Sequence, residues 1–164
     1  LQEHLGLDDD EVVKGLLNAS AVGLIIAKNA SISGAVGGCQ AECGSAAAMA
    51  ASAMVELRGG TPAQCGHAVA LVLESLMGLV CDPVAGLVEE PCVIRNASSA
   101  TLAVSSSDMA LAGIESVIPV DEVITAMGAV GKVLPPSLRE TAKGGLAATP
   151  TGRKIQSEVL HRNS

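Results

Sequence analysis

The chain has 164 residues, 49% of them apolar, and its 17 acidic residues against 10 Lys and Arg give a formal charge of −7. It contains no Phe, Trp or Tyr, so it lacks both the basic surface that binds phosphates and the rings that stack on bases, which excludes nucleic-acid binding. The mean hydropathy is +0.46, yet the longest uncharged stretch, 59–73, is shorter than the about 20 apolar residues of a membrane span. The composition therefore predicts a single soluble domain with no membrane contact.

Five cysteines are present, an odd number at irregular spacing, and we expect no secretory leader. A disulfide framework would need an even set in an oxidising compartment. The cysteines are therefore expected to be reduced thiols, and the protein is expected to be cytoplasmic.

Apolar residues recur at helical rather than strand spacing, and Gly and Pro mark the breaks. The first predicted helix begins near Asp8–Asp10, whose carboxylates cap and complement its N-terminus. Its apolar positions recur at helical spacing: Val12, Val13, Leu16, Leu17, Ala21, Leu24 and Ile25. The Ser- and Gly-rich stretch 29–38 is not expected to continue this helix. A second helix spans roughly Ala41–Leu57 and ends before a Gly pair.

Thr61 and Pro62 predict the N-cap and first residue of a third helix that runs to about Leu79. A loop with two prolines, 81–92, follows it. The remaining helices are predicted at about Val93–Leu111, from Pro119 to near Gly131, between Pro135 and Gly145, and from Pro150 to an end that frays after Leu160. The pattern predicts an all-α fold, a close-packed multi-helix domain whose Gly- and Pro-marked loops carry cysteines.

Three cysteines, Cys39, Cys81 and Cys92, lie in predicted loops or at helix edges. Cys43 and Cys65 lie inside apolar helical stretches, where a buried structural thiol is the usual interpretation. Three thiolates could hold a zinc ion, or three irons of an iron–sulfur cube with one metal position open. No Cys-x-x-Cys pair is present, so spacing alone leaves metal binding and structural thiols open. Cys43, four residues after Cys39, also remains open as a fourth ligand.

Two blocks, 28–42 (KNASISGAVGGCQAE) and 78–97 (GLVCDPVAGLVEEPCVIRNA), closely resemble the iron–sulfur-dependent L-serine dehydratases. Two later stretches, 108–123 and 138–152, resemble the α chain of the same family, so the resemblance covers nearly the whole sequence. It implies a four-iron, four-sulfur (4Fe-4S) cluster held by three cysteines, whose motifs fall on Cys39, Cys81 and Cys92. It also implies that L-serine is deaminated to pyruvate and ammonia, with the open iron acting as Lewis acid on the serine hydroxyl.

The segment before the first of these cysteines carries the candidate catalytic residues Lys28, Ser31 and Ser33. A Ser hydroxyl there could relay the α-proton, and Lys28 or Asn29 could bind the substrate carboxylate. The alternative is structural: Lys28 as a helix C-terminal cation, Asn29 as a C-cap, and the serines as turn or N-cap groups.

Arg95 and Asn96 follow the last of the three cysteines by about one helical turn and are the other candidate substrate-binding residues, with a solvated or capping role as the alternative. Asp82 is expected to accept backbone N–H bonds and shape its loop, in preference to tuning a cluster. His67 is expected to be a packed or surface histidine, and Glu42 a first-turn acid on its helix.

The resemblance implies that 1–164 is the C-terminal part of the α domain, with the N-terminal half of that domain and the β domain outside it. The expected partner is therefore the β subunit or β domain of the same enzyme, in a homo- or hetero-oligomer, and the chain alone is expected to be inactive. The missing aromatics and the lack of any cysteine after Cys92 depart from the family. Two other classes stay open: a non-catalytic helical module, and a fully ligated iron–sulfur protein for electron transfer or sensing.

Overall fold

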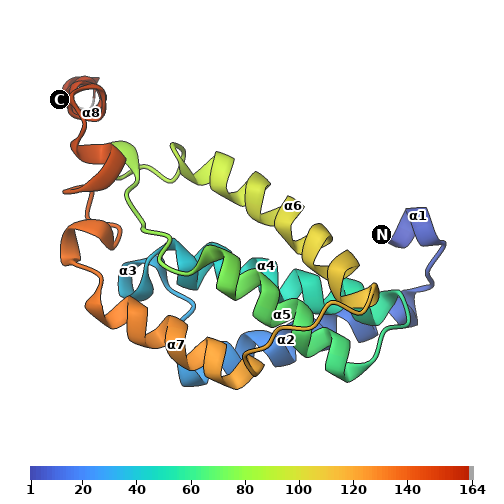
Figure 1. The fold of residues 1–164 in the computed structure, drawn as a ribbon. Helices are drawn as coiled ribbons and strands as arrows, with labels where there is room; N and C mark the ends of the chain where they lie inside the picture. The colour runs from blue at the N-terminus through green and yellow to red at the C-terminus, as the bar shows by residue number, and fades with distance from the viewer. Residues whose placement is uncertain (163–164) are drawn as a thin grey trace.

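The structure, a computed structural model, describes residues 1–162, and within them the chain forms helices and turns but no β-strand (Figure 1). The long helices are α2 (Asp9–Asn29), α4 (Cys39–Leu57), α5 (Pro62–Leu76), α6 (Cys92–Leu111), α7 (Val120–Val133) and α8 (Pro150–Arg162). The short ones are α1 (Gln2–Leu5), α3 (Gly34–Gly37) and the 3-10 turns η1 (Val84–Gly86), η2 (Pro136–Leu138) and η3 (Gly145–Ala148). The predicted all-α fold is confirmed.

Helices α2 and α5 begin where their capping residues predict. The Asp8 carboxylate accepts a hydrogen bond from Glu11 N, and the Glu11 side chain accepts one from Asp8 N. Thr61 and Gln64 form the same reciprocal box at the start of α5, with Pro in the first turn. Each box satisfies two backbone N–H groups that a helix N-terminus leaves without partners.

The segment 135–145 differs from the single short helix that was predicted there. It forms only the 3-10 turn η2 before Glu140 and Ala142 take positive φ values of 62° and 53°, and η3 begins at Gly145. A helix cannot continue through residues in the left-handed region, which explains the break. The stretch 29–38 contains the single turn α3, and α8 continues past the predicted fraying point at Leu160, while residues 163–164 lie outside the described part.

Helix α4 forms the centre of the bundle and packs against α2, α5 and α6 (Figure 1). Its buried face is built largely from small residues, including Ala47, Ala48 and Ala51, which let the neighbouring backbones approach closely. Aliphatic side chains of α5 and α7 complete this core, among them Val72, Leu73 and Met127. The described helices include none long and apolar enough to cross a membrane.

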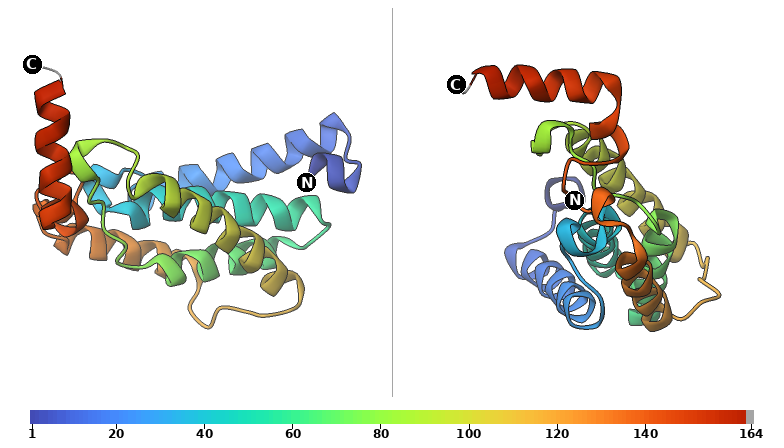
Figure 2. Two further views of the ribbon diagram at one scale, coloured as in Figure 1. Left: turned by 90° about the horizontal axis from the view of Figure 1, so that it is seen from above. Right: turned by 90° about the vertical axis from the view of Figure 1, so that its left-hand side faces the viewer.

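At the other end of the bundle from α1, helix α8 stands across the long axis (Figure 2). It packs against η1 and η3. The segments that carry the loop cysteines therefore meet near this end, where α4 and α6 begin.

Candidate metal centre

Cys39 and Cys81 come together at the end of the bundle where α4 begins, whereas Cys92 is not part of their packed cluster. Cys39 is the first residue of α4, Cys81 lies between α5 and η1, and Cys92 is the first residue of α6; all three are buried. Cys39, Cys43 and Cys81 pack into one small cluster that is separate from the main core, whereas Cys65 belongs to the main core. Cys43 is therefore buried, as predicted, but beside the other thiols.

The backbone around Gly38 holds the start of α4 against the segment that follows α5. Gly38 has φ 79° and ψ 178°, and a Cβ there would lie 2.8 Å from the carbonyl oxygen of Leu79. Gln40, two residues after Gly38, donates its backbone N–H to that same carbonyl at 2.9 Å. The buried Gln40 amide also donates to the carbonyl of Met127 and accepts from the N–H of Gly78. These bonds fix the position of the Cys39 backbone, and with it the origin of the Cys39 side chain.

Cys81 is held by a segment far along the chain. Its backbone N–H donates to the carbonyl of Leu138 at 2.9 Å, and its carbonyl accepts from the N–H of Glu140 at 2.7 Å. These two bonds form an isolated parallel bridge between Cys81 and Arg139. The residues after η2 are thereby positioned beside the cysteines.

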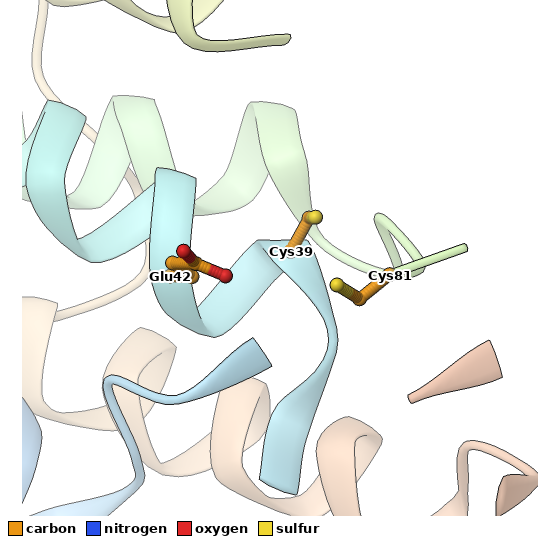
Figure 3. Close-up of side chains that lie close together, drawn as sticks. All are labelled: Cys39, Glu42 and Cys81. Atoms are coloured by element: carbon orange, nitrogen blue, oxygen red, sulfur yellow. The ribbon is translucent and has the colours of Figure 1, made fainter. Parts of the chain in front are cut away.

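The carboxylates of Glu42 and Glu140 lie near the cysteine sulfur atoms of the site. The Sγ atoms of Cys39 and Cys81 and a carboxylate oxygen of Glu42 all lie within 4.8 Å of one another (Figure 3). A Cβ built on Gly34 would lie 3.1 Å from the Cys81 Sγ, 2.5 Å from Glu42 Oε2 and 3.5 Å from Glu140 Oε2. Gly34 therefore leaves the space in which two carboxylates approach a thiol. Sulfur and carboxylate donors at this separation can hold a metal ion.

The pKa values of the clustered thiols are shifted in different directions. Hydrogen bonding from Cys43 is the main cause that lowers the pKa of Cys39 to about 6, with Cys81 and Arg95 acting in the same direction against burial. The pKa of Cys43 is raised by its hydrogen bond to Cys39, and burial raises the pKa of Cys81 and of Cys92, which the nearby charge of Cys39 raises further. The site thus favours one thiolate, and a bound cation would favour ionising the others.

A buried ion pair lies directly beside Cys39. Arg95 Nη1 donates to Asp82 Oδ1 at 2.6 Å and to the carbonyl of Val80 at 2.8 Å, and it lies 3.9 Å from the Cys39 Sγ. Asp82 Oδ2 also accepts from the N–H of Leu146 at 2.6 Å. Burial, the largest single cause, lowers the pKa of Arg95, but the hydrogen bonds and charges of Asp82 and Cys39 together outweigh it and raise the pKa overall. The predicted role of Asp82 as an acceptor of a backbone N–H bond is confirmed.

Asn96, like Arg95, is brought to the cysteines. Its Oδ1 accepts from the Cys43 thiol at 3.9 Å, and its Nδ2 donates to the Cys92 carbonyl at 2.8 Å. Both candidate substrate-binding residues of α6 therefore contact cysteines, and both are already engaged by neighbouring groups.

Of the candidates that precede Cys39, Lys28 and the two serines lie in positions that match their structural alternatives, whereas Asn29 is the last residue of α2 and Ala30 is its C-cap. Lys28 is exposed in the last turn of α2, and the Asn29 amide donates to the carbonyl one turn earlier at 2.8 Å. The Ser31 hydroxyl accepts from the N–H of Ser33 at 3.1 Å, and Ser33 is the N-cap residue of α3. Ser33 directly precedes the glycine beside Cys81, so of these four it is the nearest along the chain to the site.

Two carboxylates of the site were not among the predicted site residues. The spacing of Glu42 three residues after Cys39 could have revealed it, because that spacing puts both on one face of a helix. Glu140 gave no such signal, since it reaches the site through the bridge to Cys81. His67, expected to be a packed or surface histidine, accepts a hydrogen bond from the N–H of Ser116 at 3.2 Å.

Residues 1–147 match the family profile described as serine dehydratase alpha chain. The probable L-serine dehydratase alpha chain of Bacillus subtilis is 56% identical over 160 residues, which cover 98% of this chain and 53% of that relative. The corresponding protein of Latilactobacillus sakei is 54% identical over 98% of this chain and 77% of its own length, and the L-serine dehydratase alpha chain of Peptoniphilus asaccharolyticus is 51% identical over 96% and 54%. The chain therefore spans about half the length of the first and third of these relatives. Both the family match and these identities establish that the chain belongs to the serine dehydratase alpha chain family.

Proposed function

We propose that this chain supplies the metal centre of an L-serine dehydratase, an ammonia-lyase that converts L-serine to pyruvate and ammonia. In this proposal Cys39, Cys81 and Cys92 hold a 4Fe-4S cluster in a cytoplasmic enzyme. The observation that carries the proposal is the packing of buried Cys39 and Cys81, from two separate segments, into one cluster at an end of the bundle. Cys92 is buried at the start of α6 and feels the charge of Cys39. The names of the relatives supply the substrate.

The donor set fits an iron–sulfur cluster. Thiolates are the usual protein ligands of iron–sulfur clusters, and here the thiols form a buried group apart from the main core. The low pKa of Cys39 already favours the ligating thiolate, and Arg95 places a positive charge beside it. Positive charge next to a cluster sulfur is one of the ways in which a protein adjusts an iron–sulfur centre.

With one iron free of protein ligands, the bound cluster would supply a Lewis acid for the serine hydroxyl. The chain's own groups would bind the rest of the substrate and move protons. Arg95 and Asn96, which flank the cysteines, are the proposed groups for the substrate carboxylate, since guanidinium and amide N–H groups donate to carboxylate oxygens. Glu42 and Glu140 offer negative charge for the substrate ammonium.

The groups before Cys39 complete the proposed site. Ser33, next to the site along the chain, and Ser31, bonded to its N–H, are the proposed relay for the α-proton. Lys28 and Asn29 remain candidate groups for orienting the substrate. The relatives' unmatched length is the proposed source of what the site still needs, with the β subunit or β domain as the partner; the chain alone is expected to be inactive.

A second function, electron transfer or sensing, is favoured by one observation. Cys43 is packed against Cys39 and Cys81, so a fourth thiol is available to a cluster. A fully ligated cluster has no open iron and therefore no Lewis-acid position for serine.

Anaerobic reconstitution with iron and sulfide tests the first proposal. We expect about four irons per chain, visible thiolate-to-iron absorption, and pyruvate formation once the partner portion is added. The Cys65→Ala variant is the matched control, because Cys65 is buried in the main core away from the site. A chain that takes up no iron, alone or with its partner portion, would remove the cluster from the proposal.

A further inference from the structure

The two carboxylates beside the cysteines have no cationic partner within residues 1–162. Glu42 lies in the first turn of α4, Glu140 follows η2, and both are exposed. Neither takes part in an ion pair among these residues. Arg95, which lies beside Cys39, is engaged by Asp82. The carboxylates therefore bring negative charge to the thiols without a paired side-chain cation in the described part of the chain.

A glycine keeps the space among these groups open. Gly34 lies at the start of α3 and is not among the residues with positive φ, so its backbone conformation does not require glycine. A Cβ on it would lie 2.5 Å from Glu42 Oε2 and 3.1 Å from the Cys81 Sγ. The Glu140 Oε2 atom lies 3.5 Å from that same point. The missing side chain thus leaves room at a point that donor atoms of three separate segments surround.

The donor atoms around this space differ from the three cysteines proposed for a cluster. Cys39, Cys81 and Glu42 offer ligand atoms that all lie within 4.8 Å of one another, and Figure 3 shows these three side chains at the start of α4 and in the segment before η1. Cys92 does not belong to this group. The Cys43 thiol donates to Asn96 Oδ1 at 3.9 Å instead. The group therefore combines two thiols with carboxylate.

We propose that Cys39, Cys81 and Glu42 form a mononuclear zinc site, with Glu140 as the fourth ligand. Zinc binds thiolate and carboxylate ligands in a tetrahedral arrangement. Magnesium and calcium take oxygen ligands, and Fe²⁺ binds a given site less tightly than Zn²⁺ does. Zinc displaces the thiol protons when it binds and supplies the positive charge that the carboxylates lack.

Glu140 is placed to complete the set. Its backbone N–H donates to the Cys81 carbonyl at 2.7 Å, which holds the residue beside this ligand. Its φ of 62° lies in the left-handed region, which residues other than glycine seldom adopt. Because the side chain is exposed, its carboxylate can turn toward an ion held by the other three ligands. The exposed carboxylates also give the ion a path from solvent to the buried sulfur atoms.

The zinc site and the proposed cluster exclude each other because both use Cys39 and Cys81. This exclusion rests on the proposed function, whereas the zinc site itself does not. Glu42 belongs to the zinc site alone, and Cys92 belongs to the cluster alone. Substitutions at these two positions therefore separate the two kinds of metal binding.

Zinc titration of the reduced, metal-free chain by calorimetry tests the proposal, with Co²⁺ as a spectroscopic probe. We expect a single ion per chain and the thiolate-to-cobalt absorption of a tetrahedral site. Glu42→Gln should weaken zinc binding by at least about tenfold, since even groups that only support a ligand contribute about 10–100-fold. Glu140→Gln should weaken it by less. Glu56→Gln is the matched control, because Glu56 lies on the same helix near its other end.

Two further variants test the shape of the site and its independence from the cluster. Gly34→Ala fills the space beside Glu42 and Cys81, so it should weaken zinc binding in a folded chain. Circular dichroism confirms the fold. Cys92→Ala should keep zinc and lose the iron–sulfur cluster, whereas Glu42→Gln should lose zinc and keep the cluster. An equimolar amount of zinc should block iron–sulfide reconstitution of the wild type and hinder that of Glu42→Gln much less.

Three outcomes overturn the proposal. A chain that binds no zinc lacks the site, even if it takes up a cluster as the proposed function requires. Unchanged affinity in Glu42→Gln means that thiols alone hold the ion. Loss of zinc in a folded Cys92→Ala variant means that the ion uses the cluster ligands. Conversely, zinc binding in a chain that takes up no iron supports the zinc site and counts only against the proposed function.

Discussion

Asp82 and Arg95 form a buried ion pair that lies directly beside the Cys39 sulfur. The Asp82 side chain is 3% exposed and the Arg95 side chain 18%. Asp82 also accepts the N–H of Leu146, so one carboxylate joins the loop after α5, helix α6 and the turn before α8. Asp82 therefore stabilises the fold by joining these three segments, and it orients the cationic side chain of Arg95 toward Cys39.

Replacing Asp82 by Asn should therefore destabilise the protein by about 3 kcal/mol, because it leaves the Arg95 guanidinium buried without its counter-charge. Urea unfolding measures the change. The matched control is Asp108→Asn, which removes the partner of Arg58 in an ion pair whose side chains are 35% and 54% exposed. Exposed pairs are worth about 0–1 kcal/mol, so equal effects in the two variants would contradict a special role for the buried pair.

If Cys81 is a cluster ligand, Cys81→Ala should abolish iron retention, whereas Cys65→Ala should leave it largely intact. Both residues are buried thiols, so loss of packing is similar in the two variants. Only Cys81 lies within 4.8 Å of other candidate ligand atoms. Iron and sulfide analysis after anaerobic reconstitution measures the difference, and equal loss in both variants would remove the ligand assignment.

Cys43→Ser separates an open iron from a fully ligated cluster. With three ligands, the variant should keep about four irons per chain and still lose one readily in air. With Cys43 as fourth ligand, the wild type should resist this loss and the variant should not. Visible absorbance and iron content after timed air exposure give the answer without an activity assay.

The helices could largely be predicted from the sequence because their ends are encoded locally. The capping boxes that begin at Asp8 and Thr61 act over three residues, and the loop prolines restrict only their neighbours. The segment 135–145 could not be predicted in the same way. Its course depends on the bonds between Cys81 and the residues at 138–140, which are distant in sequence.

The candidate site shows the same division. The loop or helix-edge positions of Cys39, Cys81 and Cys92 were visible in the sequence, and the structure brings the first two together. The approach of Glu140 depends on tertiary contacts, as does the packing of Cys81 against Cys43, whereas the four-residue spacing of Cys39 and Cys43 on one helix could be read from the sequence. Periodicity alone also did not show which apolar face of α2 packs inward, because its small residues rather than its leucines contact α4.

Gly38→Ala should be among the most damaging single substitutions in the chain. Its φ of 79° and ψ of 178° fall in a region that is essentially restricted to glycine, and a Cβ would lie 2.8 Å from a backbone oxygen of Leu79. We expect a loss of about 3 kcal/mol or more of unfolding free energy from strain and the displaced start of α4. Because Cys39 begins α4, iron retention should fall as well.

Gly59→Ala is the control for this substitution. Gly59 also has a positive φ, 76°, but a Cβ there would meet no atom within 4 Å. It should therefore cost about 1 kcal/mol from backbone strain alone, and it lies at the far end of α4, where Cys39 is unaffected. Urea unfolding and iron content of the two variants should separate. If Gly59→Ala lost as much iron as Gly38→Ala, the effect would reflect general destabilisation, and the close fit of Gly38 against Leu79 would have no particular role in placing Cys39.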